Sequence, residues 1–191
     1  SRGLEDVYKR QVSECIDKEN VKLAMFFHDI AKPECFTVDF SGRGHFKGHA
    51  QKSALKAEAV MKRMRFPKSV ILNVKAIIYH HSDELNTEFE LKKILNQIGV
   101  RNAFDLIDAQ RADSLSKQDF CRERLKKSDM QEQSLRDILK RGECFSIKML
   151  DINGYDLIEL GFKGIEIKNA LSLLLDNVMR GIVENSRDSL M

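Results

Sequence analysis

The residues best suited to chemistry are the five histidines, because all of them fall between positions 28 and 81. His28 is followed directly by Asp29 at the end of an apolar segment, and the other imidazoles follow a glycine-rich loop or the next apolar segment. Neutral imidazole and carboxylate groups are ligands for first-row metals and for Mg²⁺ or Mn²⁺. Ligands at the ends of separate helices can converge on one ion. The pattern favours a metal site, and the alternative is a set of ordinary core and surface histidines.

Two further features define the set of candidate ligands. Asp113 lies on the apolar side of a predicted helix, so we include its carboxylate. His80 and His81 are adjacent, and adjacent side chains diverge by about 100° around an ideal helix. His81 shares a face with the apolar stripe of its helix, whereas His80 does not. We therefore expect at most one of the two to be a ligand.

The sequence around the His-Asp pair resembles a known family. Residues 27–33, Phe-His-Asp-Ile-Ala-Lys-Pro, are similar to the signature of HD-superfamily metal-dependent phosphohydrolases. Later motifs resemble a narrower group, the HD domain of bacterial tRNA nucleotidyltransferases, which are CCA-adding enzymes and their poly(A) polymerase relatives. The resemblance covers residues 19–190 and rests on several motifs in the right order. These motifs lie at 44–50, 79–80, 111–113, 143–146, 152–157 and 160–161, and in a closing helix with Gly181 and Asn185.

The resemblance implies an all-α fold, an HD-domain helical bundle followed by a helical tail. It also implies a divalent cation, Mg²⁺, Mn²⁺ or Ni²⁺, and assigns catalysis to His28 and Asp29 with Lys32 beside them. His49 and His80 take the family's intermediate histidine positions, as ligands or phosphate contacts. The implied metal ligands are His28, Asp29, His49, His80 and Asp113.

This chain departs from the family pattern in two places. HD domains usually have one more histidine upstream of the pair, and no histidine precedes His28 here. We expect that ligand, together with a nucleotidyltransferase head domain, in a missing N-terminal part. Ala31 stands where glycine is commonest, and alanine is compatible with a helix end. His45, on the loop, is a candidate substrate contact.

Positive charge is concentrated in one stretch. Between Arg43 and Lys75 there are nine cations and one anion, Glu58. Such a stretch indicates an anionic partner, namely nucleic acid, a nucleotide or phosphate, or else a solvated helix face. We expect Lys32 to neutralise substrate charge at the mouth of the site. The residues predicted to contact phosphate or nucleic acid are Lys47, Lys52, Lys56, Lys62, Arg63 and Arg111.

Three functions are consistent with these residues. The first is the C-terminal HD and tail region of a tRNA nucleotidyltransferase with phosphohydrolase activity of its own, in which a bound metal lowers the pKa of water from 15.7 to about 7. The second is a module that positions tRNA without catalysis, by recognising the shape of the RNA and contacting its phosphates. The third is a free-standing phosphohydrolase acting on a nucleotide or a small phosphate ester. The strands and paired aspartates that add nucleotides in the family are absent, so we expect no nucleotide addition by this chain.

Apolar periodicity predicts the elements that must position the site. We expect seven to nine helices, a loop or hairpin at 36–46, and an amphipathic helix whose apolar face runs from 167 to 182. The other helices are predicted at 19–31, 48–64, 67–81, 88–98, 100–116 and 119–141. Residues 1–11 resemble a translated adapter or assembly scar and are excluded from the fold. We expect an HD domain at 12–116 and a helical tail at 117–191.

Composition excludes several other classes of protein. The 191 residues are 42% hydrophobic and 32% charged, which is typical of a globular protein. No apolar run approaches the roughly 20 residues that cross a bilayer, and no secretory signal precedes the first helix, so we expect a cytoplasmic protein without a membrane partner. The four cysteines are widely spaced, which argues against a zinc ribbon or a disulfide framework.

Overall fold

The computed structural model describes residues 18–116 and 122–191. Within these residues the chain forms eight α-helices, two short 3₁₀ helices (η1, Lys32–Cys35, and η2, Ile147–Met149) and one hairpin. The prediction of an all-α bundle is therefore confirmed. In the same residues no helix combines the length and the apolar character needed to cross a membrane. The segment 1–11, predicted to be a scar, lies outside the described residues.

The described chain divides into two compact units. The first combines the residues up to Glu84 with Val100–Glu132, and the second combines Leu85–Gly99 with Gln133–Met191. Helix α5 (Glu88–Ser116) contributes to both units because it is interrupted at Gly99, whose φ of 79° and ψ of 166° are not helical. Glycine adopts a positive φ without the steric penalty of a Cβ. The two helices predicted at 88–98 and 100–116 are thus confirmed, whereas a domain boundary after residue 116 stays a prediction.

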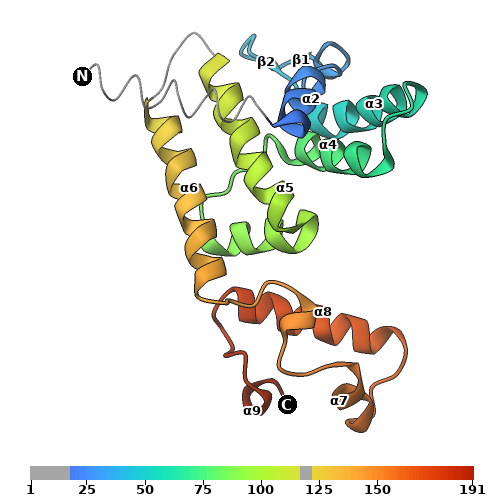
Figure 1. The fold of residues 1–191 in the computed structure, drawn as a ribbon, viewed down its shortest axis with the longest axis vertical. Helices are drawn as coiled ribbons and strands as arrows, with labels where there is room; N and C mark the ends of the chain where they lie inside the picture. The colour runs from blue at the N-terminus through green and yellow to red at the C-terminus, as the bar shows by residue number, and fades with distance from the viewer. Residues whose placement is uncertain (1–17, 117–121) are drawn as a thin grey trace. The chain divides into compact units, whose positions relative to one another are not determined.

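Three helices form the core of the first unit: α2 (Glu19–Phe27), α3 (His49–Arg63) and α4 (Lys68–His80). Helices α3 and α4 agree with the predicted 48–64 and 67–81 to within one residue at each end, and they pack side by side (Figure 1). The buried face of α3 carries small side chains, so α4 can approach its backbone closely. The fully covered core residues of these helices include Val21, Ala24, Ala54, Ala57, Met61, Val74, Ile77 and Ile78.

The predicted helix at 19–31 is wrong at its end, because α2 stops at Phe27. Beyond that residue the backbone tightens to bonds between residues three apart, from Ile30 to Phe27 (3.2 Å) and from Lys32 to Asp29 (2.9 Å). The amide of Ala31, which would continue an α-helix by bonding to Phe27, instead donates to Oγ of the buried Ser53 at 3.1 Å. This hydrogen bond to α3 therefore ends the helix before Pro33 does.

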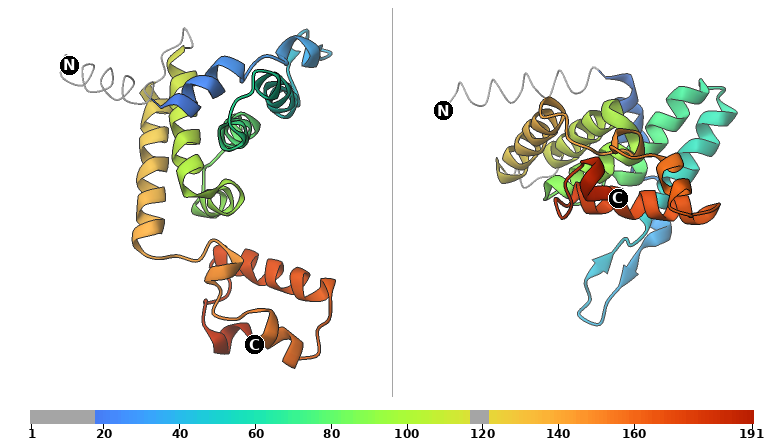
Figure 2. Two further views of the ribbon diagram at one scale, coloured as in Figure 1. Left: turned by 45° about the vertical axis from the view of Figure 1, so that its right-hand side comes forward. Right: turned by 90° about the horizontal axis from the view of Figure 1, so that it is seen from below.

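The loop predicted at 36–46 is confirmed as a hairpin. Strands β1 (Thr37–Val38) and β2 (Gly44–His45) pair antiparallel, with Thr37 opposite His45. In the turn, Oδ1 of Asp39 accepts from the backbone amides of Ser41 and Arg43. The hairpin projects away from the helices of its own unit (Figure 2).

The second unit is built around an apolar cluster. It contains the part of α6 (Arg122–Lys140) beyond Glu132, together with α7 (Gly154–Glu159), α8 (Ile165–Met179) and α9 (Arg187–Leu190). The first residues of the predicted 119–141 helix, 119–121, lie outside the described part of the chain. The predicted face from 167 to 182 is wrong at its end, because α8 stops before Gly181, whose φ is 71°, and Ile182 is exposed. The cluster comprises Cys144, Leu150, Ile152, Leu157, Leu171, Leu175, Val178, Met179 and Leu190.

Candidate metal centre

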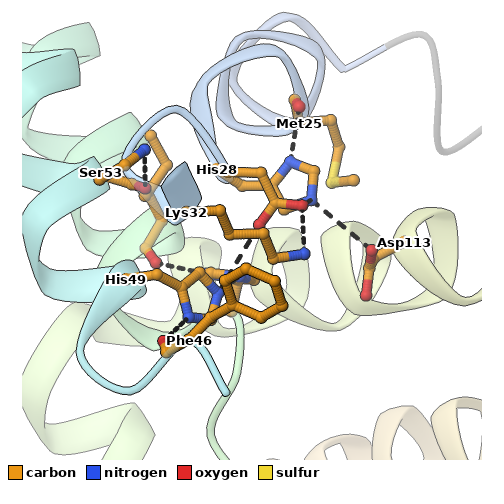
Figure 3. Close-up of polar contacts among 11 residues, drawn as sticks. Met25, His28, Lys32, Phe46, His49, Ser53 and Asp113 are labelled. Atoms are coloured by element: carbon orange, nitrogen blue, oxygen red, sulfur yellow. Dashed lines mark hydrogen bonds and ion pairs between the residues drawn. The ribbon is translucent and has the colours of Figure 1, made fainter. Parts of the chain in front are cut away.

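Four elements of the first unit bring imidazole and carboxylate groups together. His28 and Asp29 follow α2, His49 begins α3, His81 follows α4, and Asp113 lies near the end of α5. Nε2 of His28 lies 3.1 Å from Oδ2 of Asp29 and 3.6 Å from Oδ1 of Asp113. Figure 3 shows the His28 and Asp113 side chains directed toward one another, with His49 on the other side of the group. Helix ends that are far apart in sequence therefore meet at one point.

His49 and His81 complete the group. Nε2 of His49 is 3.6 Å from Oδ1 of Asp29 and 3.2 Å from Nε2 of His81. The His81 ring packs edge-on against both other rings, with centroids 5.2 Å from His28 and 5.0 Å from His49. Ligand atoms of His28, Asp29 and His81 all lie within 4.8 Å of one another, which meets the spacing of a metal site.

Each of the three clustered histidines makes the same bond through its other nitrogen. Nδ1 of His28 contacts the Met25 carbonyl at 2.7 Å, and Nδ1 of His49 contacts the Phe46 carbonyl at 2.8 Å. Nδ1 of His81 contacts the Ile78 carbonyl, also at 2.7 Å. A carbonyl oxygen only accepts, so each Nδ1 carries the proton. In the neutral ring Nε2 then has an unprotonated lone pair, which is the arrangement that prepares a histidine to bind metal.

The cluster consequently has more acceptors than donors at its centre. The Nε2 atoms of His49 and His81 are 3.2 Å apart, and two lone pairs do not bond to each other without a proton or cation between them. Nε2 of His28 and Oδ1 of Asp29 are buried without a hydrogen-bond partner among the described residues. Buried polar atoms without partners cost free energy. A divalent cation would satisfy these atoms together, so the residues present fit such an ion.

The ionisation of the rings reflects this environment. Burial opposes charging of His28, but the Asp113 carboxylate, the Met25 carbonyl and the Asp29 carboxylate together raise the pKa of its imidazole above the ordinary value. Burial lowers the pKa of His81, and the neighbouring imidazoles lower it further. The more enclosed ring is thus kept in the neutral form that a metal requires.

The structure does not bring His80 into this cluster. His80 is the last residue of α4, and its Nδ1 contacts Oδ2 of Asp83 at 2.6 Å. His81, one residue later, lies beside His28 and His49 instead. His81 lies on the apolar face of α4, and this position is the feature of the sequence that favours His81 as the ligand. The motif resemblance, by contrast, implies His80. Among the implied ligands, we therefore replace His80 by His81.

Lys32 and Gln110 support the cluster from its edges. Nζ of Lys32 donates to Oδ2 of Asp29 at 2.6 Å and lies 5.7 Å from the centre of the Phe46 ring. The Gln110 amide donates to the carbonyls of His81 (3.1 Å) and Asp83 (2.9 Å), which holds the turn after α4. Lys32 thus occupies one oxygen of Asp29 and leaves the other facing His49.

The cations predicted to contact phosphate are placed in different ways. Lys47, Lys52 and Arg63 are exposed. Lys56 pairs with Glu34, and Lys62 lies 2.7 Å from Glu58. His45, the candidate substrate contact, bonds to Asp39 on the hairpin at 2.6 Å.

Arg111 is the predicted phosphate contact that the structure does not support. The residue is only 4% exposed, and its guanidinium donates to Asp108, Asp129 and Glu132 at 2.8–3.0 Å. Because Arg111 is buried and already paired with three carboxylates, it is not available to a substrate phosphate. We therefore withdraw the predicted contact.

A cavity of about 350 Å³ opens beside the histidine cluster within the first unit. His28, Asp29, His49, His81 and Asp113 all line it, as does Lys32. This volume lies in the range of small-molecule sites, roughly 300–1,000 Å³. The cluster is therefore reachable by a small ligand.

Comparisons with known proteins identify the family of this chain. A family model described as HD domain matches residues 5–139, most of the chain, and the chain therefore belongs to the HD-domain family. HD domains are typically metal-dependent phosphohydrolases, and the clustered His28, Asp29 and His81 are consistent with metal binding. The match begins inside residues 1–11, whose non-native origin stays a prediction.

The chain is also similar to a tRNA nucleotidyltransferase. Over 174 residues it is 30% identical to the CC-adding tRNA nucleotidyltransferase of Thermus thermophilus. The alignment covers 88% of this chain and 38% of that protein, so the chain spans well under half of the relative's length. No solved structure matches the chain. The predicted relation to the HD region of the tRNA nucleotidyltransferases is thereby confirmed.

Proposed function

We propose that the first unit binds one divalent cation through His28, Asp29, His49 and His81, with Asp113 as a distal ligand, and hydrolyses a phosphoester there. One observation carries the proposal: the Nε2 atoms of His49 and His81 lie 3.2 Å apart, while both Nδ1 atoms are committed to carbonyls. That arrangement is electrostatically unfavourable unless a cation or proton lies between the rings.

The side chains have separate roles in the proposed reaction. A bound cation supplies an activated water and polarises the phosphoryl oxygen. Asp29 uses one oxygen for Lys32, which leaves Oδ1 to accept a hydrogen bond or contact the ion. Lys32 places a positive charge at the cavity, where it offsets phosphate charge. Hydrolysis adds the water oxygen to phosphorus and breaks the ester P–O bond, and the proton lost by water goes to the departing alcohol.

The proposal is tested by metal titration followed by hydrolysis of bis-p-nitrophenyl phosphate with Mn²⁺, Ni²⁺ or Mg²⁺. We expect turnover that a chelator abolishes and that His28→Ala lowers by at least about a hundredfold, which corresponds to about 2.7 kcal/mol. His80→Ala is the matched control, because that imidazole lies outside the cluster and bonds to Asp83. Turnover that persists in His28→Ala, or that falls equally in both variants, contradicts the proposal.

A second candidate function is binding of tRNA without hydrolysis. The observation that favours it is the similarity to an enzyme whose name states that it acts on tRNA. The exposed Lys47, Lys52 and Arg63 place positive charge at the surface of the first unit. Salt-dependent tRNA binding that Lys52→Glu with Arg63→Glu weakens, in a chain without metal-dependent turnover, would support this function over the first.

A further inference from the structure

Helix α6 forms a second wall of the cavity beside the histidine cluster. Arg124, Lys127, Ser128 and Gln131 all line that cavity. Their spacing, three, four and seven residues from the first, places them on one face of a helix. Ser128 and Gln131 are buried and the two cations are exposed, so this face presents polar groups to the cavity from the base to the rim.

The two cations on this wall differ from the other positive charge near the site. Lys32 is paired with Asp29, and Arg111 is paired with three carboxylates. Among the described residues, no carboxylate forms an ion pair with Arg124 or Lys127. Their charge is therefore available to a ligand.

Helix α6 is held in place against α5 by Arg111. Its guanidinium donates to Asp129 and Glu132 of α6 while its own helix carries Asp113 two residues later. Along the same helix, Asp129 lies five residues after Arg124, and Glu132 lies five residues after Lys127. This ion-pair clamp couples the cationic face of α6 to a helix that supplies a residue of the histidine cluster.

We propose that Arg124 and Lys127 form the phosphate-binding wall of this site and select a small phosphate-bearing ligand, of the size of a mononucleotide. The inference rests on the proposed function, since it names the substrate class of the same cavity. The arginine fork suits two phosphate oxygens and the lysine acts as a point charge. Asp83 and Glu84 also line the cavity, so the cationic face of α6 is the part of its lining that attracts an anion. A volume of about 350 Å³ suits a ligand of the size of a mononucleotide.

Adjacent lysines provide a matched test. Lys127 lines the cavity, whereas Lys126 is exposed on the same helix about 100° away and is not among the lining residues. Lys127→Gln, Arg124→Gln and Lys126→Gln each remove one exposed charge and keep a good helix former. Binding of inorganic phosphate and of adenosine monophosphate is measured by calorimetry on the full chain with Mn²⁺ present, and KM and kcat are measured with bis-p-nitrophenyl phosphate.

We expect Lys127→Gln and Arg124→Gln each to weaken phosphate and mononucleotide binding by about tenfold and to raise KM with little change in kcat. Lys126→Gln should leave both unchanged. Equal effects of Lys126→Gln and Lys127→Gln overturn the inference, because they show a non-specific charge effect. Loss of tRNA binding without loss of phosphate binding also overturns it, because the wall then contacts an RNA backbone.

The two proposals fail separately. If no phosphoester is hydrolysed but Lys127→Gln still weakens phosphate binding, the hydrolase proposal fails and the phosphate wall stands. If hydrolysis requires metal and His28 but is indifferent to Arg124→Gln and Lys127→Gln, the hydrolase proposal stands and the phosphate wall fails.

Discussion

Two polar clusters meet along α5 in the first unit, and they differ in how their hydrogen bonds balance. Around Arg111, a buried cation donates to Asp108, Asp129 and Glu132, and Lys18 donates to the other oxygen of Asp108 at 2.7 Å. Around His28, three imidazoles and Asp29 turn acceptor atoms toward one another. The first cluster joins opposite charges, whereas the second leaves buried acceptors facing acceptors.

This difference separates a structural cluster from a ligand site. A buried ion pair that is complete within the protein holds helices together, and removal of one partner leaves an uncompensated charge. A cluster with unmatched lone pairs is incomplete without a cation, so its residues add little to the stability of the metal-free chain. The two clusters therefore predict mutational effects on different quantities, stability for the Arg111 cluster and metal affinity for the histidine cluster.

The largest expected effect is on the Arg111 cluster. Arg111→Met keeps the apolar stem and removes the charge, which leaves Asp108, only 7% exposed, with a weaker set of partners. We expect the free energy of unfolding to fall by about 3 kcal/mol, measured by urea denaturation. Arg101→Met, at an exposed position of the same helix, should change it by less than about 0.5 kcal/mol. If the two variants unfold alike, Arg111 does not hold α5 and α6 together.

The histidine cluster should respond in metal affinity. We expect His81→Ala to weaken Mn²⁺ or Ni²⁺ binding by about a hundredfold, or about 2.7 kcal/mol, because it removes a lone pair that faces His49. His80→Ala should weaken binding by less than about threefold, under about 0.7 kcal/mol, since that ring bonds to Asp83. Calorimetric titration of both variants decides the point, and a larger effect at His80 would restore the assignment made from the motif.

A smaller effect, on both stability and metal affinity, is expected for a substitution of Ser53. Ser53→Ala removes the acceptor for the Ala31 amide, and both residues are fully buried. The loss should be about 2 kcal/mol of stability, together with a few-fold loss of metal affinity because the turn carrying Asp29 is less fixed. Ser69→Ala, an exposed serine of α4, is the control for both measurements. Unchanged metal affinity in Ser53→Ala would show that the turn is positioned by other contacts.

Sequence reasoning located the helices of the first unit well because their apolar faces repeat with the helical period. Helices α3 and α4 and the break in α5 at Gly99 were all visible in this way. The end of α2 was not, because the Ala31 amide donates its hydrogen bond to Ser53, 22 residues away. The prediction that the apolar face of α8 extends to Ile182 is wrong for a local reason, because the backbone turns at Gly181.

The sequence by itself determined the resemblance to the HD-domain family, through ordered motifs that begin at His28-Asp29, and it determined the all-helical fold, because apolar side chains repeat with the helical period. Only the tertiary structure decided which of His80 and His81 faces the pair, that Arg111 is enclosed by carboxylates, and that Arg124 and Lys127 share a cavity with the histidines. Those outcomes depend on how separate helices pack, which fixes the direction of each side chain and has no counterpart in residue order.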